Sequence, residues 1–479
     1  MIVVNYGFWL CFVKNLIQNR FIFYTLNNSS IIMVVMKIHT FKGGIFPREM
    51  KELTNKCPIK DVMPSSKMVT IPVTMGGAPN VPCVAVGDLV ARGQVIANGD
   101  KFMNCPVHSS VSGKVKKIQN CVVTGNQQAQ CIIIEADEEN RTEFMEPLDP
   151  FTCETSQALE RIKNAGIVGM GGASFPTHVK LNPPEDKTID YVLINAAECE
   201  PYLTCDERTL QEETKKFIDG IAIVLRLVGA QGIIALEENK AYIRPVLLEE
   251  IKNQGYGDDI SVCVVKTKYP QGSEKFIVAS CLGIEIPSGK LPADAGVIIC
   301  NVGTVCAISD AFRLGKPLID RALTISGGAV ENPCNIRVPV GTLISDLMPD
   351  VFTLKENSCA MIISGGPMMG FAMADTSFPV AKGTSGVTFL TADETYLGEE
   401  DQCISCGNCA ARCAMRLTPV MIIRELKSGN LEKARKFGLM DCIECGCCAF
   451  VCSAHINIVQ RVRLGKAMMR QKMAESKKK

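Results

Sequence analysis

Residues 403–413 read CISCGNCAARC, and residues 442–452 read CIECGCCAFVC. Both runs have the spacing C-x2-C-x2-C-x3-C, in which cysteine thiolates bind a [4Fe–4S] cluster. Where a protein has two such runs, the fourth cysteine of each run ligates the cluster of the other run. The spacing therefore predicts one cluster on Cys403, Cys406, Cys409 and Cys452, and a second on Cys442, Cys445, Cys448 and Cys413.

Structural zinc is the alternative for cysteines in C-x2-C pairs. Zinc sites use two pairs separated by a longer span, with four ligands around one tetrahedral ion. A third cysteine at the same step favours an iron–sulfur cube instead. Proline usually follows the fourth cysteine of a cluster run, whereas Ala414 and Ser453 stand there. Cys447 is a further cysteine inside the second run and is not needed as a ligand.

The composition indicates a multidomain globular protein. A chain of 479 residues is expected to form about three domains, and 47% hydrophobic with 21% charged residues is ordinary for large cores. A net charge of +1 argues against nucleic-acid binding through a broad basic field. The 24 cysteines show no repeating spacing outside the two runs, which suits a reducing cytosol and, with iron–sulfur clusters, an anaerobe.

The two ends of the chain have unusual composition. Residues 1–35 are apolar, but polar residues interrupt them, and no segment reaches the ~18 apolar residues of a membrane span. We expect this stretch to be an extension or a start-site artefact, with an interfacial anchor as the alternative. The basic tail, residues 461–479, is expected to be a solvated helix end, with anionic lipid or an acidic partner as the alternative.

The remaining residues predict an α/β multidomain fold. Short strands and turns over residues 36–140 resemble a lipoyl/biotinyl-carrier-like barrel-sandwich module. Helices alternating with apolar strands over residues 150–320 predict an α/β domain with a mainly parallel sheet. Residues 321–390 predict a small β-grasp-like domain of the SLBB type. Residues 391–479 predict a helical, ferredoxin-like domain that carries both cysteine runs.

A carrier module can display a modified lysine on a hairpin. Lys101, in the segment NGDKFMNCPV, is the candidate for lipoylation. The residues after it lack the apolar and acidic flanks that such a motif has. An unmodified module that packs against its neighbours is therefore the favoured interpretation.

The predicted α/β domain contains a glycine-rich loop, GMGGASFPT at residues 169–177, followed by Lys180. Glycines lack Cβ atoms, so their backbone N–H groups can approach a phosphate or a flat ring closely. Polar segments also follow predicted strands, namely NAAECEP at 195–201, YPQGSE at 269–274 and NVGT at 301–304. Because parallel sheets bind ligands at the carboxyl ends of their strands, these segments predict one ligand site.

These motifs carry a resemblance to a known family. From about Thr40 to Lys466 the chain resembles the C subunit of the Rnf complex, the ion-pumping ferredoxin:NAD+ oxidoreductase. The central domain is similar to the flavin-bearing, NADH-oxidising subunit of respiratory complex I. The resemblance rests on FKGGIFP, GMGGASFPTHVK, INAAECEPYLTCDERTL, YPQGSEKF, SGKLPADAGVIICNVGT, SGGPMMG and both cysteine runs.

The resemblance implies FMN and NAD(H) as cofactors beside the two [4Fe–4S] clusters. It implies that Glu200 and Glu274 are catalytic and that Lys180 lies near the FMN phosphate. Two positions depart from the pattern: Met170 stands where complex I relatives carry arginine, and Phe46 where histidine is expected. The implied cofactor-binding residues are Gly169, Gly171, Gly172, Ala173, Phe175, Lys180, Asn195, Glu198, Tyr269, Gly272, Lys290, Asn301 and Thr304.

The resemblance also implies a function. Electrons would pass from reduced ferredoxin, through integral-membrane and ferredoxin-type Rnf subunits, to the clusters, FMN and NAD+, or in the reverse direction. The chain would then be peripheral, on the cytoplasmic face of the cell membrane. One alternative is a soluble reductase of the same family that feeds a cobalamin or proline reductase. Another is an iron–sulfur scaffold without flavin. The four histidines are interpreted as structural.

Overall fold

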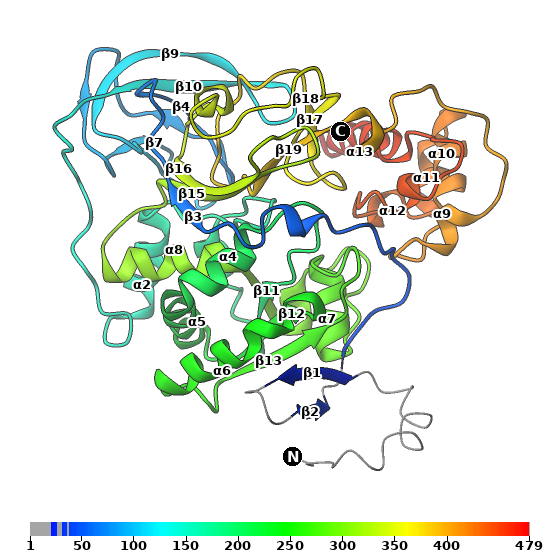
Figure 1. Cartoon of the computed structure of the whole chain (residues 1–479), viewed down its shortest axis with the longest axis horizontal. Coiled ribbons are helices and arrows are strands. Elements are labelled where there is room, and N and C mark those ends of the chain that lie inside the picture. The colour runs from blue at the N-terminus through cyan, green and yellow to red at the C-terminus, as the bar shows by residue number, and fades with distance from the viewer. Residues whose placement is uncertain (1–20, 26–30, 36–37, 479) are drawn as a thin grey trace.

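The computed structural model describes residues 21–25, 31–35 and 38–478. The expected extension, residues 1–35, therefore lies mostly outside the described residues. Its described part consists of two antiparallel strands, β1 (Phe21–Thr25) and β2 (Ile31–Val35). Two β-rich units lie side by side above an α/β domain in Figure 1, and a helical unit lies to their right. Within the described ranges, no helix has the length and apolar character needed to cross a bilayer.

The barrel-sandwich module consists of two antiparallel sheets with strand orders β4-β10-β9-β6 and β5-β7-β8. The β10 strand alternates, so that Ile132 and Ile134 are buried in a core shared with Ile96 of the second sheet. This alternation is the pattern expected for strands with one buried face. Its strands are β4 (Met68–Pro72), β5 (Val81–Pro82), β6 (Leu89–Val90), β7 (Val95–Asn98), β8 (Val107–His108), β9 (Gly113–Val123) and β10 (Gln127–Ala136).

The α/β domain has a parallel sheet with the strand order β13-β12-β11-β14. One apolar core joins the sheet to α2, α5 and α8, and a smaller core on the other face includes Ile277 and Val278 of α7. Its elements are α2 (Thr155–Asn164), α3 (Thr177–Lys180), β11 (Tyr191–Ala196), α4 (Cys205–Glu212), α5 (Thr214–Val228), β12 (Gln231–Glu237), η4 (Glu238–Ile243), α6 (Arg244–Asn253), β13 (Ile260–Val265), α7 (Glu274–Leu282), η5 (Pro292–Ala295), β14 (Val297–Asn301) and α8 (Val302–Arg313).

The second β-rich unit is a mixed six-stranded sheet with the order β18-β17-β19-β15-β16-β3. Its edge strand β3 comes from the N-terminal part of the chain and pairs in parallel with β16. Phe352, Phe378 and Phe389 are fully buried in its core. Its elements are β3 (Ile59–Asp61), β15 (Asp320–Ser326), β16 (Cys334–Pro339), η6 (Ile344–Leu347), β17 (Met361–Ser364), β18 (Phe371–Met373), β19 (Gly386–Leu390) and η7 (Ala392–Glu394).

The C-terminal unit is helical and carries both cysteine runs. Gly429 and Asn430 separate α10 from α11, and the Asn430 side chain caps α11 by accepting from the N–H of Lys433. Ile422 and Ala434 are buried between these helices and α13. The elements are α9 (Asn408–Ala411), α10 (Pro419–Lys427), α11 (Leu431–Lys436), η8 (Leu439–Asp441), α12 (Cys447–Phe450) and α13 (Ile458–Lys478).

The segment before the barrel-sandwich module connects the other three units, as the blue trace in Figure 1 shows. His39 pairs beside Val265 at the end of β13, and Ile45 pairs with Tyr269. The segment continues through η3 (Lys51–Leu53) to β3. Residues far apart in the sequence therefore meet along this segment, next to the ligand site predicted from the sequence.

Candidate functional site

A cavity of about 450 Å³ lies at the carboxyl ends of β11 and β14. This is where parallel sheets bind ligands, and the volume is within the range of cofactor pockets, about 300–1,000 Å³. Gly172 lies in the loop that borders the cavity. Lys290, in contrast, is exposed on the connection between α7 and η5 and does not line it. The predicted residues that line the cavity are Gly169, Gly171, Ala173, Phe175, Lys180, Asn195, Glu198, Glu200, Tyr269, Gly272, Glu274, Asn301 and Thr304.

The glycine-rich loop is closed at its base by antiparallel pairing between Val168 and Pro176. The N–H of Gly169 donates to the carbonyl of Phe175 at 2.8 Å. A Cβ added at Gly172 would meet no atom within 4 Å, so this part of the loop faces open space. The loop therefore forms a cradle whose backbone a phosphate or a flat ring can approach.

Met170, which replaces the arginine of complex I relatives, is buried under the loop. Its N–H donates to Oγ1 of Thr304 at 2.9 Å, and its carbonyl accepts from Nη2 of Arg321 at 3.2 Å. Arg321 belongs to β15 of the six-stranded sheet and is only 2% exposed. A buried guanidinium therefore lies behind the loop, although residue 170 itself carries no charge.

Lys180 and Glu274 form an ion pair at the cavity wall, with 3.0 Å between Nζ and Oε1. The same ammonium donates to the carbonyl of Ile299 at 3.0 Å. Glu274 is the first residue of α7. The residue implied to bind phosphate is thus paired with a residue implied to be catalytic, and an arriving anionic group would compete with Glu274 for the ammonium.

Thr177 is a cavity residue that the sequence motifs did not reveal. The residue is 1% exposed and lines the cavity, and within the described structure its Oγ1 has no hydrogen-bond partner. Buried polar atoms are nearly always paired. An unpaired hydroxyl beside the glycine cradle and Lys180 therefore fits a bound phosphate-bearing flavin. The only signal in the sequence is a polar residue at the end of the loop.

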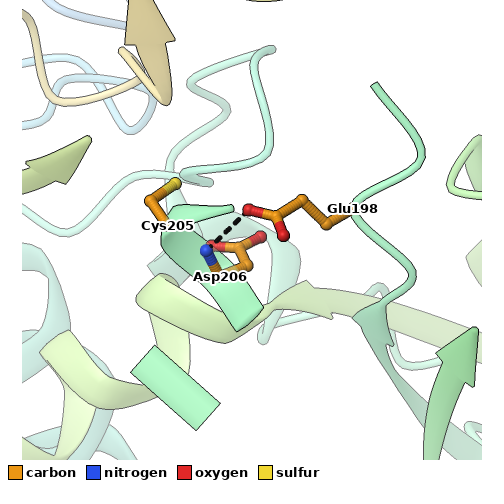
Figure 2. A group of neighbouring side chains, drawn as sticks. All are labelled: Glu198, Cys205 and Asp206. Atoms are coloured by element: carbon orange, nitrogen blue, oxygen red, sulfur yellow. Dashed lines mark hydrogen bonds between the residues drawn. The ribbon is translucent and has the colours of Figure 1, made fainter. Parts of the chain in front are cut away.

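Figure 2 shows Glu198, Cys205 and Asp206 around the first turn of α4, with their possible ligand atoms within 4.8 Å of one another. Glu198 accepts from the N–H of Asp206 at 2.7 Å, and Asp206 accepts from Nδ2 of Asn301 at 2.7 Å. Cys205 donates to the carbonyl of Ser385 at 3.1 Å. Because protein groups already occupy these atoms, we assign the cluster to shaping the cavity and not to binding a metal ion.

Lys51 of η3 binds the backbone of the loop that carries Glu198 and Glu200. The buried ammonium of Lys51 donates to the carbonyls of Glu198 at 2.8 Å and of Glu200 at 3.2 Å. Glu198 has a left-handed backbone, with φ of 47°. Burial raises the pKa of its carboxyl to about 7, although Lys51 acts in the opposite direction.

Glu200, implied to be catalytic, is held by the six-stranded unit. Its carboxylate accepts from the N–H groups of Met368 at 3.1 Å and Met369 at 2.9 Å. A Cβ at Gly366 would lie 2.3 Å from this carboxylate, which explains why the third residue of SGGPMMG is glycine. Burial raises the pKa of Glu200 to about 7, although the hydrogen bonds to its carboxylate lower it.

A second cavity lies in the helical unit and brings together cysteines of both runs. Cys413 of the first run lines it with the three expected ligands of the second run, Cys442, Cys445 and Cys448, and the further cysteine Cys447 lines it too. The N–H of Leu417 donates to the sulfur of Cys413 at 3.3 Å, and the N–H of Glu444 donates to the sulfur of Cys442 at 3.4 Å. Cysteines of both runs around one cavity, with N–H groups directed at sulfur, fit a cluster whose sulfurs accept hydrogen bonds.

The remaining cysteines of the two runs lie towards the surface. Cys403 and Cys406 are exposed. The pKa of Cys409 is raised by burial and, to a smaller extent, by the neighbouring Cys406 and Cys452. The structure thus places Cys452 of the second run beside the first run.

The two cavities adjoin. Ile443 lines both of them. Tyr269 lines the first cavity, and its hydroxyl donates to the carbonyl of Cys445, which lines the second, at 2.7 Å. The two cavities are therefore separated by a thin wall of side chains from the α/β domain and the helical unit.

Two other predicted positions lie away from the cavity. Lys101 is exposed on the turn between β7 and β8, but the hairpin around it is packed: the carbonyl of Phe102 is 2.9 Å from Nε2 of His178. The hairpin around Lys101 is thus a contact between domains.

Phe46 also lies away from the cavity. Its side chain is 60% exposed, and the ammonium of Lys266 lies 5.2 Å from its ring centroid.

Two family models match the chain. The Nuo51 FMN-binding domain matches residues 162–310, and the RnfC barrel sandwich hybrid domain matches residues 39–139. The first range contains the glycine-rich loop and the strands that border the larger cavity. The second contains the two antiparallel sheets.

Several curated proteins, all C subunits of oxidoreductase complexes, are similar over most of their length. The one from the proton-translocating ferredoxin:NAD(+) oxidoreductase complex of Clostridium ljungdahlii is 41% identical, over 84% of this chain and 88% of its own. Its counterpart in the Na(+)-translocating complex of Acetobacterium woodii is 37% identical, over 85% and 91%. The protein from the ion-translocating oxidoreductase complex of Rhodobacter capsulatus is 37% identical, over 91% and 84%.

Proposed function

The chain belongs to the RnfC family, the C subunits of ion-translocating ferredoxin:NAD+ oxidoreductase complexes, and we propose that it transfers electrons between NAD(H), FMN and two [4Fe–4S] clusters. One observation carries the proposal: the cavity beside the glycine loop adjoins the cavity lined by cysteines of both runs, through Ile443 and Tyr269. A protein that only bound nucleotide would not need this junction.

The chain has an FMN-binding domain, and the residues around its cavity fit that cofactor. Bound there, FMN exchanges a hydride with NAD(H) and single electrons with iron–sulfur clusters. In the proposed site Lys180 and the cradle of Gly169, Gly171, Gly172 and Ala173 hold the phosphate. Lys290 is not part of this site, because it lies exposed outside the cavity. Thr177, Asn195, Glu198, Asn301 and Thr304 line the cavity and would contact the bound flavin.

The nicotinamide side of the cavity is assigned to Phe175, Glu200, Tyr269, Gly272 and Glu274, all of which line it. Phe175 is 38% exposed and supplies an apolar face at the opening. Hydrogen bonds from the N–H groups of Met368 and Met369 hold the Glu200 carboxylate in one orientation, and a fixed side chain is what stacking of two flat rings requires. Glu274 is paired with Lys180 in the structure, and a phosphate bound at Lys180 would free its carboxylate for the nicotinamide side.

The helical unit is proposed to be ferredoxin-like, with crossed ligand sets. Cys442, Cys445, Cys448 and Cys413 would hold the cluster near the flavin. The other cluster would lie on Cys403, Cys406, Cys409 and Cys452, with two of these cysteines exposed. Its position at the surface suits exchange with a partner. The six-stranded unit is proposed to be β-grasp-like, of the SLBB type.

The proposal extends to the assembly. The relatives are named as subunits of multisubunit complexes, and we propose that this chain docks on integral-membrane and ferredoxin-type Rnf subunits at the cytoplasmic face of the membrane. Ferredoxin would then exchange electrons with it indirectly. Pull-down from membranes tests this point: recovery with integral-membrane partners supports it, and recovery only with soluble reductases supports the soluble alternative.

The chemistry is tested on protein purified without oxygen. The protein should contain flavin, iron and acid-labile sulfide, and NADH should drive reduction of a viologen dye. Protein that holds iron and sulfide but neither binds FMN nor reacts with NADH would instead be a scaffold without flavin.

A further inference from the structure

Two parts of the chain outside the α/β domain, the barrel-sandwich module and the six-stranded unit, contact the glycine-rich loop. Ser174, in the middle of the loop, has a left-handed backbone with φ of 48°. Residues other than glycine rarely adopt this conformation, because it brings Cβ too close to the following carbonyl oxygen. It persists only where the surroundings enforce it. Two glycines, Gly76 and Gly383, lie against Ser174 and supply those surroundings.

Gly76 belongs to the barrel-sandwich module and lies against the backbone of Ser174. A Cβ at Gly76 would lie 1.9 Å from the carbonyl oxygen of Ser174 and 3.1 Å from its Cβ. Gly77 lies next to it, and its Cβ would be 2.8 Å from Cγ of Pro176. Gly76 therefore allows this module to contact the loop backbone at a distance that no side chain permits, and Gly77 allows a close contact with the Pro176 side chain.

Gly383, which follows Lys382 in the six-stranded unit, also contacts the loop. A Cβ at Gly383 would lie 2.4 Å from Oγ of Ser174 and 3.7 Å from the carbonyl of Gly172. The contact here is with a side-chain oxygen, which can rotate, whereas the contact of Gly76 is with the backbone, which cannot.

Further contacts fix the barrel-sandwich module and the segment around Gly383 relative to each other and to the loop. The buried ammonium of Lys382 donates to the carbonyls of Pro106 at 2.8 Å and Gly166 at 2.7 Å. It thereby joins the barrel-sandwich module to the residues that lead into the loop. On the far side of the loop, the carbonyl of Phe102 lies 2.9 Å from Nε2 of His178.

We infer that the barrel-sandwich module and the segment around Gly383 act as a clamp that holds the glycine loop in its FMN-binding shape. The inference rests on the proposed function, because it assumes that this loop binds FMN. It gives the carrier-like module a role of its own: positioning the loop through Gly76, in place of carrying a group on Lys101.

The test compares two glycines of the same module that have the same backbone conformation. Gly76 has φ of 105° and Gly87 has φ of 102°, but a Cβ at Gly87 would meet nothing within 4 Å. FMN-stripped full-length protein is titrated with FMN, and iron content is measured alongside. Gly76→Ala should weaken FMN binding at least tenfold with iron unchanged, and Gly87→Ala should bind FMN like the wild type. Equal affinities for the two variants, high or low, would overturn the inference.

A second pair of variants decides the matter if Gly76→Ala does not fold. Gly383→Ala should weaken FMN binding about threefold, because the added methyl group must displace only Oγ of Ser174. Ser174→Ala removes that oxygen, so the double variant should recover the affinity of Ser174→Ala alone. Absence of any effect of Gly383→Ala, or of the recovery, contradicts the clamp. Wild-type protein that binds no FMN contradicts the proposed function itself, which is a different outcome.

Discussion

The hydroxyl of Tyr269 donates a hydrogen bond to the carbonyl of Cys445, with 2.7 Å between the two oxygens. Tyr269 is 1% exposed and lines the cavity beside the glycine loop, while the buried Cys445 lines the cavity in the helical unit. This bond joins residues 176 positions apart. It sets the distance and the orientation between the two cavities, on which electron transfer between them depends.

Tyr269→Phe removes only this hydroxyl. A buried hydrogen bond is worth about 1 kcal/mol, which corresponds to about fivefold in an equilibrium constant. We expect electron transfer from flavin to clusters to slow by about that factor, because the Cys445 loop loses its fixed position. The same hydroxyl lies 3.4 Å from Glu200 on the nicotinamide side, so rapid-mixing spectroscopy with NADH is used to measure flavin reduction and cluster reduction as separate steps. An unchanged cluster rate would show that the bond does not matter.

Lys180→Ala should weaken FMN binding by roughly 10- to 100-fold, because a hydrogen bond to a charged group is worth about 1.5–3 kcal/mol. The loss is measured by titrating stripped protein with FMN. Lys290→Ala is the matched control, since Lys290 is exposed and does not line the cavity. A stronger effect at residue 290 than at residue 180 would place the phosphate elsewhere.

The crossed ligand sets predict how much iron is lost when two cysteines are replaced together. Cys413→Ala and Cys442→Ala together should remove one cluster, about half of the iron, because both residues would ligate the same cluster. Cys413→Ala with Cys403→Ala should remove nearly all of the iron. Iron and sulfide analysis distinguishes the two results. Cys447→Ala is the control and should keep both clusters. Loss of all iron in the first pair would contradict the crossed arrangement.

The buried carboxyl of Glu237 should make the stability of the folded chain depend on pH. The residue is 1% exposed, and burial raises the pKa of its carboxyl from 4.5 to about 7, although Lys240 and Lys51 act in the opposite direction. Between these pH values the folded chain holds a proton that the unfolded chain releases. The stability that Glu237 contributes is therefore fully present below about pH 4.5 and is lost as the pH rises through 7, by up to ~3 kcal/mol.

Glu237→Gln should make the melting temperature less dependent on pH over this range. Above pH 7, where the carboxyl is ionised, absolute stability should also fall, because Lys240, 3.4 Å from the carboxylate, loses its charged partner. The pH dependence of the melting temperature is thus the informative quantity. An unchanged dependence in the variant would assign it to other buried carboxyls, such as Glu198 and Glu200.

Local patterns in the sequence predicted the elements but not their long-range contacts. The sheet strands follow from periodicity and turn residues. Most cavity residues, in contrast, were implied by the motifs that the chain shares with the family it resembles. The contacts of Glu200 with Met368 and of Lys51 with the Glu198 loop join residues about 150 positions apart or more. No local period encodes such pairs. Lys290 stays a prediction from the resemblance, and in the structure its side chain is exposed and does not line the cavity.

The central claim is that one cavity handles paired electrons and passes them singly to the adjoining cluster site. Its most direct test is a titration of the oxygen-free, FMN-loaded protein with NADH, followed by absorbance and electron paramagnetic resonance. We expect the flavin absorbance to fall and the signal of a reduced [4Fe–4S] cluster to appear in the same sample. Flavin that is reduced beside intact clusters that stay oxidised would contradict the claim.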